Sequence, residues 1–263
     1  MARFCTLFSG SSGNCTYIGG AAGGILIDAG SNAKQIRLAL ETAGIPLDSI
    51  KAIFVTHEHT DHISGLRVFA AREKTAVYCS AGTLSALEDS NAWTGNVNAG
   101  VIDYGGIETA GMLITPFYTA HDCRQSNGYV IKTADGRRIA VATDLGHVGG
   151  EVRGALRGCD LVMLESNHDV GMLRNGGYPY HLKRRIMSST GHLSNEACAA
   201  ELPELVRSGT TRIVLAHLSR ENNHPDLALQ ESRYTLQQSG MTEDIDYIIR
   251  VAPRTSPDKM MVL

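Results

Sequence analysis

The chain has 263 residues, of which 43% are hydrophobic and 19% are charged, a balance typical of one large globular domain or two small ones. Its formal net charge of −3 excludes a uniformly basic surface, so any footprint for nucleic acid must be local. No apolar run is long enough to span a bilayer, no signal peptide is recognisable and the six cysteines form no C-x-x-C pair, so we expect a cytoplasmic protein with reduced thiols and no membrane partner.

In the first part of the chain, short apolar runs separated by small residues predict strands. These runs are Phe4–Phe8, Thr16–Ile18, Ile25–Asp28, Ile53–Val55 and Val77–Cys79. Apolar residues at helical spacing, such as Ile36 and Leu40, predict helices between them. The expected helices are Ala33–Ala43, Ile63–Arg72 and Thr83–Asp89.

The second part repeats this order of strands followed by helices. The expected strands are Leu113–Tyr118, Gly128–Thr133, Arg138–Thr143, Leu161–Glu165, Ile213–Ala216 and Asp246–Val251. The expected helices are Leu182–Ser188, Asn195–Val206 and Pro225–Gln238. Asp135-Gly136 predicts a hairpin turn, and Ser194 is a natural N-cap. The repeated pattern, with no linker, favours a single domain over residues 1–263 that folds as a four-layer α/β/β/α sandwich with two facing mixed sheets.

An H-x-H-x-D-H run directly follows the expected buried strand at Ile53–Val55. It comprises His57, His59, Asp61 and His62. Residues two apart in extended backbone point the same way, and a bend would aim the last two at a second point. Imidazole and carboxylate groups suit Zn, Mn or Fe, so the run predicts two divalent metal ions side by side. The alternative is a polar loop that is rich in histidine by chance.

Three further polar residues follow predicted strands. They are His121, Asp144 and His217. Any one of them alone would be best interpreted as an ordinary surface residue. Because active-site residues gather at strand ends in α/β folds, the three together with the H-x-H-x-D-H run predict the remaining metal ligands.

This ordered set resembles the five-motif signature of the metallo-β-lactamase superfamily, with Asp28 in the place of the first motif. The resemblance implies a ligand division between two metals: His57, His59 and His121 for one, and Asp61, His62 and His217 for the other. It also implies that Asp144 bridges both metals and that Asp28 orients a ligand histidine or its loop.

Further segments are similar to the YycJ/WalJ (VicX) branch of this superfamily. They are Ser9–Asn14, Leu164–Asp169, Tyr178–Tyr180, Gly191–Glu196 and His217–Asn223. That resemblance implies a DNA exonuclease that works from 5′ to 3′. The residues that we expect to contact the substrate are Ser11, Asn14, Asn167, His168, Tyr180, Lys183, Arg220 and Asn222.

Two features bear on phosphodiester chemistry. Cations interleaved with tyrosines near residues 174–185 could hold phosphates and stack bases, although an ordinary solvated helix face is the alternative. Gly191-His192-Leu193-Ser194 echoes Ala216-His217-Leu218-Ser219, and only the second follows a β-branched strand. Related nucleases place an extra histidine near the scissile phosphate, so His192 is expected at the leaving oxygen. The alternative is a loop histidine bonded to backbone.

The leading hypothesis is a nuclease in which a metal-bridging hydroxide attacks phosphorus and Asp61 or Asp144 accepts its proton. Its partner would be nucleic acid, with DNA favoured, and the oligomeric state stays open. One alternative is a hydrolase of a small thioester, lactone or β-lactam with the same metal centre. Another is a catalytically weak regulatory or binding protein, which the complete ligand set argues against.

Overall fold

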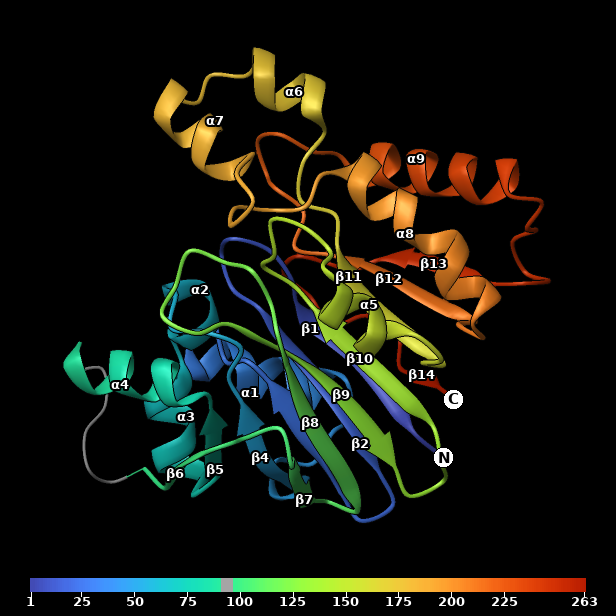
Figure 1. Cartoon of the computed structure of the whole chain (residues 1–263). Helices are drawn as coiled ribbons and strands as arrows, with labels where there is room; N and C mark the ends of the chain where they lie inside the picture. Colours follow the sequence, from blue (N-terminus) through green and yellow to red (C-terminus); the bar gives the residue numbers. More distant parts are fainter. Residues whose placement is uncertain (91–96) are drawn as a thin grey trace. The chain divides into compact units, whose positions relative to one another are not determined.

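A computed structural model describes residues 1–90 and 97–263 (Figure 1). By its internal contacts the chain divides into two compact units. Unit 1 comprises Met1–Pro116, Cys123–Arg137 and Pro253–Leu263, and unit 2 comprises Phe117–Asp122 and Arg138–Ala252. The expectation of a single domain stays a prediction. Among the described residues, every helix is too short or too polar to traverse a lipid bilayer.

Unit 1 contains a mixed sheet with the strand order β14-β1-β2-β3-β4-β5-β6. Its strands are β1 (Arg3–Phe8), β2 (Cys15–Gly20), β3 (Gly23–Ile27), β4 (Ile50–Phe54), β5 (Ala76–Cys79), β6 (Ala99–Val101) and β14 (Met261–Val262). Strands β1, β2 and β3 pair antiparallel, whereas β3 to β6 are parallel. Parallel pairing brings the carboxyl ends of β3 and β4 to one edge of the sheet.

Four α-helices accompany this sheet: α1 (Ala33–Thr42), α2 (Thr60–Ile63), α3 (Leu66–Glu73) and α4 (Ala81–Asp89). The short 3₁₀ turn η1 (Leu47–Ser49) precedes β4. Ile36 and Leu40 of α1 are fully buried, as their helical spacing predicts, and they join Phe69 of α3 in one hydrophobic cluster. At roughly 2 kcal/mol for each fully buried large apolar side chain, this cluster stabilises the position of the helices on the sheet.

Unit 1 also contains strands of a second sheet, namely β7 (Ile107–Thr109), most of β8 (Met112–Tyr118) and β9 (Asn127–Thr133). The Tyr129 hydroxyl on β9 donates to the carbonyl of Val55 at 2.6 Å, and its ring meets the edge of Phe54 at 5.7 Å. Strand β9 therefore packs against the end of β4, and the two sheets face each other here. The prediction of two facing mixed sheets is confirmed.

Unit 2 is built on four parallel strands: β10 (Arg138–Ala142), β11 (Leu161–Glu165), β12 (Arg212–Ala216) and β13 (Ile248–Val251). Its helices are α5 (Gly150–Leu156), α6 (Val170–Asn175), α7 (Tyr180–Ile186), α8 (Asn195–Arg207) and α9 (Pro225–Gln238). Helices α8 and α9 pack against each other, and the Ser194 side chain caps α8 as predicted. Within this unit, α6 and α7 stand away from the strands and form what we call the α6–α7 arm, residues 170–186 (Figure 1).

The expected helix Ile63–Arg72 is present as α3, but it begins three residues later than predicted, because α2 ends at Ile63 and α3 starts after Gly65. A Cβ atom on Gly65 would lie 2.1 Å from the carbonyl oxygen of Ser31, so the chain approaches too closely for any other residue. Among the described residues, the sequence did not predict the short helices α2 and α6, nor α5, whose apolar pattern is interrupted by three glycines (149, 150 and 154). Helix propensity is low for glycine, and tertiary packing overrides it here.

Candidate metal-binding groups

Asp28 is the first polar residue at the shared edge of the parallel strands of unit 1. It follows β3 directly and is buried. Its Oδ1 accepts from the backbone N–H of Thr56 at 2.8 Å, and its Oδ2 lies 2.7 Å from Nδ1 of His62. Burial raises the pKa of Asp28, while His62 and Thr56 oppose that rise. A carboxylate on Nδ1 fixes the tautomer of His62, so its Nε2 presents a lone pair.

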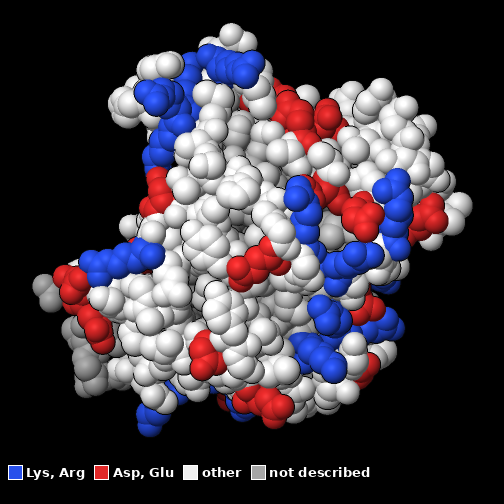
Figure 2. Space-filling model, viewed as in Figure 1, with Lys and Arg blue, Asp and Glu red and all other residues white. Residues whose placement is uncertain are grey.

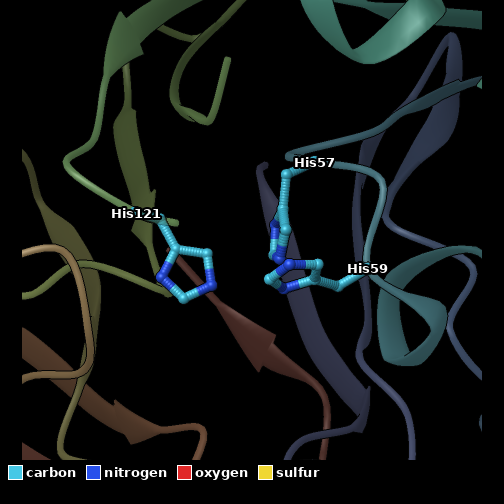
Figure 3. Close-up of side chains that lie close together, drawn as sticks. All are labelled: His57, His59 and His121. Carbon is cyan, nitrogen blue, oxygen red and sulfur yellow. The ribbon is translucent and has the colours of Figure 1, made fainter. Parts of the chain in front are cut away.

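The H-x-H-x-D-H run lies in the loop after β4 and enters α2. The rings of His57 and His59, both drawn in Figure 3, have centroids 4.5 Å apart, and those of His57 and His62 are 4.1 Å apart. Oδ2 of Asp61 lies 3.5 Å from Nε2 of His62. Unit 1 therefore gathers three imidazoles and a carboxylate into one cluster, the donor set that a divalent transition metal prefers.

The Ser9–Asn14 loop contributes one residue to this cluster. Asn14 is buried, and its side-chain amide nitrogen lies 3.0 Å from Nε2 of His62 and 3.3 Å from Oδ2 of Asp61. Ser11, the other residue of this loop that we expected to contact substrate, is exposed.

Polar residues also gather at the carboxyl ends of the strands of unit 2. Glu165 ends β11, Asp144 follows β10 by two residues and His217 follows β12 directly. His121 follows β8, and all four side chains are buried. Parallel strands bring these ends to one edge, and candidate ligand atoms of Asp144, Glu165, His192 and His217 lie within 4.8 Å of one another.

Sequence reasoning assigned no role to Glu165. It is fully buried, and its Oε1 lies 2.8 Å from Nδ1 of both His192 and His217. Its Oε2 accepts from the backbone N–H groups of Leu145 and Leu193. Burial alone would raise the pKa of Glu165, but His192 and His217 lower it to about 2, so the carboxylate is ionised. A charged residue that ends the otherwise apolar strand Leu161–Glu165 was the available signal.

His192 bonds to Glu165 through Nδ1, and the same atom is 3.7 Å from Oδ1 of Asp144. The side chain of His192 therefore contacts carboxylates, which differs from the alternative of a loop histidine bonded to backbone. Burial lowers the pKa of His192, but Glu165 and Asp144 outweigh that effect and the net pKa is raised.

His121, drawn in Figure 3, has Nδ1 at 3.0 Å from the carbonyl oxygen of Gly191. An N–H must donate to a carbonyl, so Nε2 of His121 presents its lone pair. That Nε2 is 3.9 Å from Oδ1 of Asp144, and Nδ1 of His217 is 3.2 Å from the same oxygen. Buried carboxylates or a carbonyl thus hold His62 in unit 1, and His121 and His217 in unit 2, in defined tautomers, an arrangement that fits metal ligation.

Of the other residues expected to contact substrate, three are buried within unit 2. Asn167 donates to the carbonyl of His217 at 2.8 Å, so it supports that residue. His168 and Asn222 are buried, and within the described residues Nδ1 of His168 and Nδ2 of Asn222 have no hydrogen-bond partner. These two polar atoms remain available to a ligand that could reach them.

The remaining three lie at the surface. Tyr180 is 75% exposed, and Arg220 is exposed. Lys183 instead donates through Nζ to the carbonyls of Arg174 and Gly176, so it caps the end of α6.

Comparison with known proteins agrees with this geometry. Residues 24–218 match the model of the β-lactamase superfamily domain. The chain is 35% identical over 242 residues to the exodeoxyribonuclease YycJ of Bacillus anthracis, covering 90% of each protein. It is 34% identical over 260 residues to the exodeoxyribonuclease WalJ of Streptococcus pneumoniae, covering 97% of this chain and 95% of that protein. The metallo-β-lactamase fold protein YhfI of Bacillus subtilis matches with a TM-score of 0.72 and 14% identity, over 98% of this chain and 99% of YhfI.

Proposed function

The chain belongs to the metallo-β-lactamase superfamily, and we propose that it is a metal-dependent exonuclease that hydrolyses phosphodiester bonds in DNA. The observation that carries the proposal is its identity of 34–35% to exodeoxyribonucleases over 90% or more of the chain. The small-substrate alternative, a thioester, lactone or β-lactam hydrolase, has no comparable support. Polarity from 5′ to 3′ and a preference for DNA over RNA are part of the proposal.

Two divalent ions, of Zn, Mn or Fe, complete the proposed centre. His57, His59 and His121 would hold one ion, Asp61, His62 and His217 would hold the other, and Asp144 would be a ligand of both. The tautomers fixed by Asp28, Gly191 and Glu165 support this assignment. When bound, such ions lower the pKa of water and stabilise charge on attacking and leaving oxygens.

Protein side chains supply the proton transfers. Asp61 or Asp144 would accept the proton of the attacking water, since both are carboxylates beside the proposed ligands. His192 would donate to the leaving oxygen, because Glu165 orients its ring and raises its pKa toward the protonated form.

The α6–α7 arm supports a nucleic-acid substrate. Lys and Arg side chains gather on it, as Figure 2 shows. Lys183 donates to carbonyls of the arm itself and Arg185 pairs with Asp122, but the side chains of Arg174 and Arg184 make no ion pair or hydrogen bond within the described residues. Tyr180 and Arg184 are four residues apart on α7, hence on one helix face. Together they can stack a base and neutralise a phosphate.

The test is incubation with end-labelled single- and double-stranded DNA and RNA under Mn, Zn and Mg. Shortening of DNA from the 5′ end, with loss of the activity in His59→Ala, is the expected result. Activity on small esters without any cleavage of nucleic acid would contradict the proposal. Cleavage of RNA in preference to DNA would keep the nuclease and overturn its substrate.

A further inference from the structure

The amide of Asn14 has an orientation that its contacts determine. Its Oδ1 accepts from the backbone N–H of Gly10 at 2.9 Å, and an N–H can only donate. The other end of the amide is therefore the NH₂ group, which can only donate. This group lies 3.0 Å from Nε2 of His62 and 3.3 Å from Oδ2 of Asp61.

His62 offers a single lone pair to this donor. Its Nδ1 lies 2.7 Å from Oδ2 of Asp28 and carries the ring proton, so Nε2 is the acceptor. One imidazole nitrogen has one lone pair, which it can give either to an N–H or to a metal ion. The hydrogen bond from Asn14 and metal ligation by Nε2 of His62 thus exclude each other.

We propose that the side-chain amide of Asn14 is a displaceable latch that competes with a divalent metal for His62 and Asp61. The proposal rests on the proposed function, because it takes these two residues as ligands of one metal. In its latched position the amide satisfies both acceptors. A metal ion on these two residues would take the only lone pair of His62 Nε2 and would repel the donor N–H groups of the amide, which would then move away.

The backbone of Asn14 is held in place by hydrogen bonds and cannot move together with the side-chain amide. Its N–H donates to the carbonyl of Asp61 at 2.8 Å, and its carbonyl accepts from Gly30 at 2.8 Å. A Cβ atom on Gly30 would lie 1.6 Å from the carbonyl oxygen of Asp61, so the backbones of Gly30 and Asp61 are in close contact and leave no room for the segment to shift. Release must therefore come from rotation of the side chain, which also breaks its bond to the N–H of Gly10.

Metal loading is thereby coupled to the Ser9–Asn14 loop. Gly10 and Gly13 adopt φ values of 132° and 152°, a backbone that glycine tolerates and other residues rarely adopt. Loss of the Asn14 contact frees the Gly10 end of the loop, where Ser11 and Ser12 are exposed. Metal binding should consequently change the hydrogen bonding of the Ser9–Asn14 loop, whose residues Ser11 and Ser12 are exposed to solvent.

The decisive experiment measures metal affinity by competition with a chromogenic chelator in Asn14→Ala and in wild type. Removing a competitor tightens metal binding, and we expect about a tenfold gain, which about 1.4 kcal/mol of hydrogen bonding would give. Asn32→Ala is the matched control, because the side-chain oxygen of Asn32 also accepts from a backbone N–H in unit 1, that of Gln35, but Asn32 lies in the turn before α1. Its metal affinity should equal that of wild type.

Weaker metal binding in Asn14→Ala would contradict the latch and show that Asn14 supports the metal ligands. Unchanged binding would show that Asn14 has no effect on metal affinity. If that variant does not fold, Asn14→Leu keeps most of the volume and still removes the donor. Hydrogen exchange on wild type gives an independent measurement: the Gly10 amide should exchange faster once Zn is added. Slower or unchanged exchange there would also contradict the latch.

His62→Ala separates this proposal from the metal assignment on which it rests. Loss of one metal from His62→Ala, with unchanged affinity in Asn14→Ala, would overturn only the latch. Full metal content in His62→Ala, or no divalent metal bound by wild type, would overturn both.

Discussion

Asp28, Asp144 and His217 share a left-handed backbone, with φ values of 62°, 58° and 55°. A residue other than glycine enters this region at a cost of about 1 kcal/mol or more. Such outliers persist where surrounding contacts hold a side chain for function, and each of these three carries a candidate metal-binding or ligand-orienting group. Each also follows a buried strand within two residues, so the fold supplies the rigidity that the strain requires.

Glu165 gives a pH-dependent prediction at this scale. Its pKa falls from 4.5 to about 2 in the folded protein, so the ionised carboxylate stabilises the fold above pH 4.5. That stabilisation is lost as the pH falls from about 4.5 towards 2. In chelator-treated protein, the difference in unfolding free energy between wild type and Glu165→Gln should be about 2 kcal/mol smaller at pH 3 than at pH 7. Urea denaturation measures it.

The control for Glu165 is Glu41→Gln, at an exposed position of α1. It should stay within about 0.5 kcal/mol of wild type at both pH values. A Glu165→Gln difference that is equal at pH 3 and pH 7 would show that the carboxylate does not stabilise the fold through His192 and His217.

His192 and His217, which both contact Glu165, should differ in the effect of their removal on metal content. His217→Ala removes a proposed ligand and should lower metal content and activity together. His192→Ala should keep its metal and lose turnover by about 10²–10⁴-fold, the usual effect of one positioned acid. Metal analysis beside nuclease kinetics measures both. If His192→Ala lost metal and His217→Ala did not, His192 would be the metal ligand and His217 the proton donor.

At the scale of elements, the α6–α7 arm places Tyr180 and Arg184 on one exposed helix face. Tyr180→Ala should weaken binding of single-stranded DNA by about 1–3 kcal/mol, the usual contribution of one stacked base. Arg184→Ala should reduce the salt dependence of binding by about one phosphate contact. Fluorescence anisotropy over a salt series measures both effects. The control is Tyr234→Ala, at an exposed tyrosine of α9. An equal loss of DNA affinity in this control would show that the α6–α7 arm has no specific part in DNA binding.

The boundary between α2 and α3 gives a second prediction for elements. Gly65→Ala should destabilise the fold by about 1–3 kcal/mol, because its Cβ would overlap the backbone of Ser31. Gly154→Ala, inside α5 with open space around the new methyl group, should instead stabilise it by about 0.5–1 kcal/mol. Urea denaturation of both variants tests the opposite signs, and equal stability of Gly65→Ala and wild type would refute the close approach.

For the whole molecule, metal binding should stabilise the folded chain, because the unfolded chain does not hold the proposed ligands in place. At a free metal concentration of about 100 times the dissociation constant, the gain is about 2.7 kcal/mol. For a chain of this size that corresponds to a rise of roughly 5–10 °C in Tm. Thermal unfolding with a chelator, and again after excess Zn or Mn, measures it. An identical Tm in both conditions would argue against a metal that binds the native state.

Local sequence patterns predicted most of the helices and strands and most of the proposed ligand set. Apolar spacing predicted α1, the Ser194 cap predicted the start of α8 and the H-x-H-x-D-H run predicted a metal-binding cluster. These features depend on residues within a few positions of one another, so local chemistry encodes them.

The side chains that orient the histidines are brought to them by contacts that form only when the chain folds. Glu165 reaches His192 and His217 across 27 and 52 positions, and Asn14 reaches His62 across 48. Such contacts depend on strand register and on where each chain turn ends, which no local pattern specifies. For the same reason Lys183 looked available to a phosphate in the sequence, whereas the fold uses its charge to cap α6.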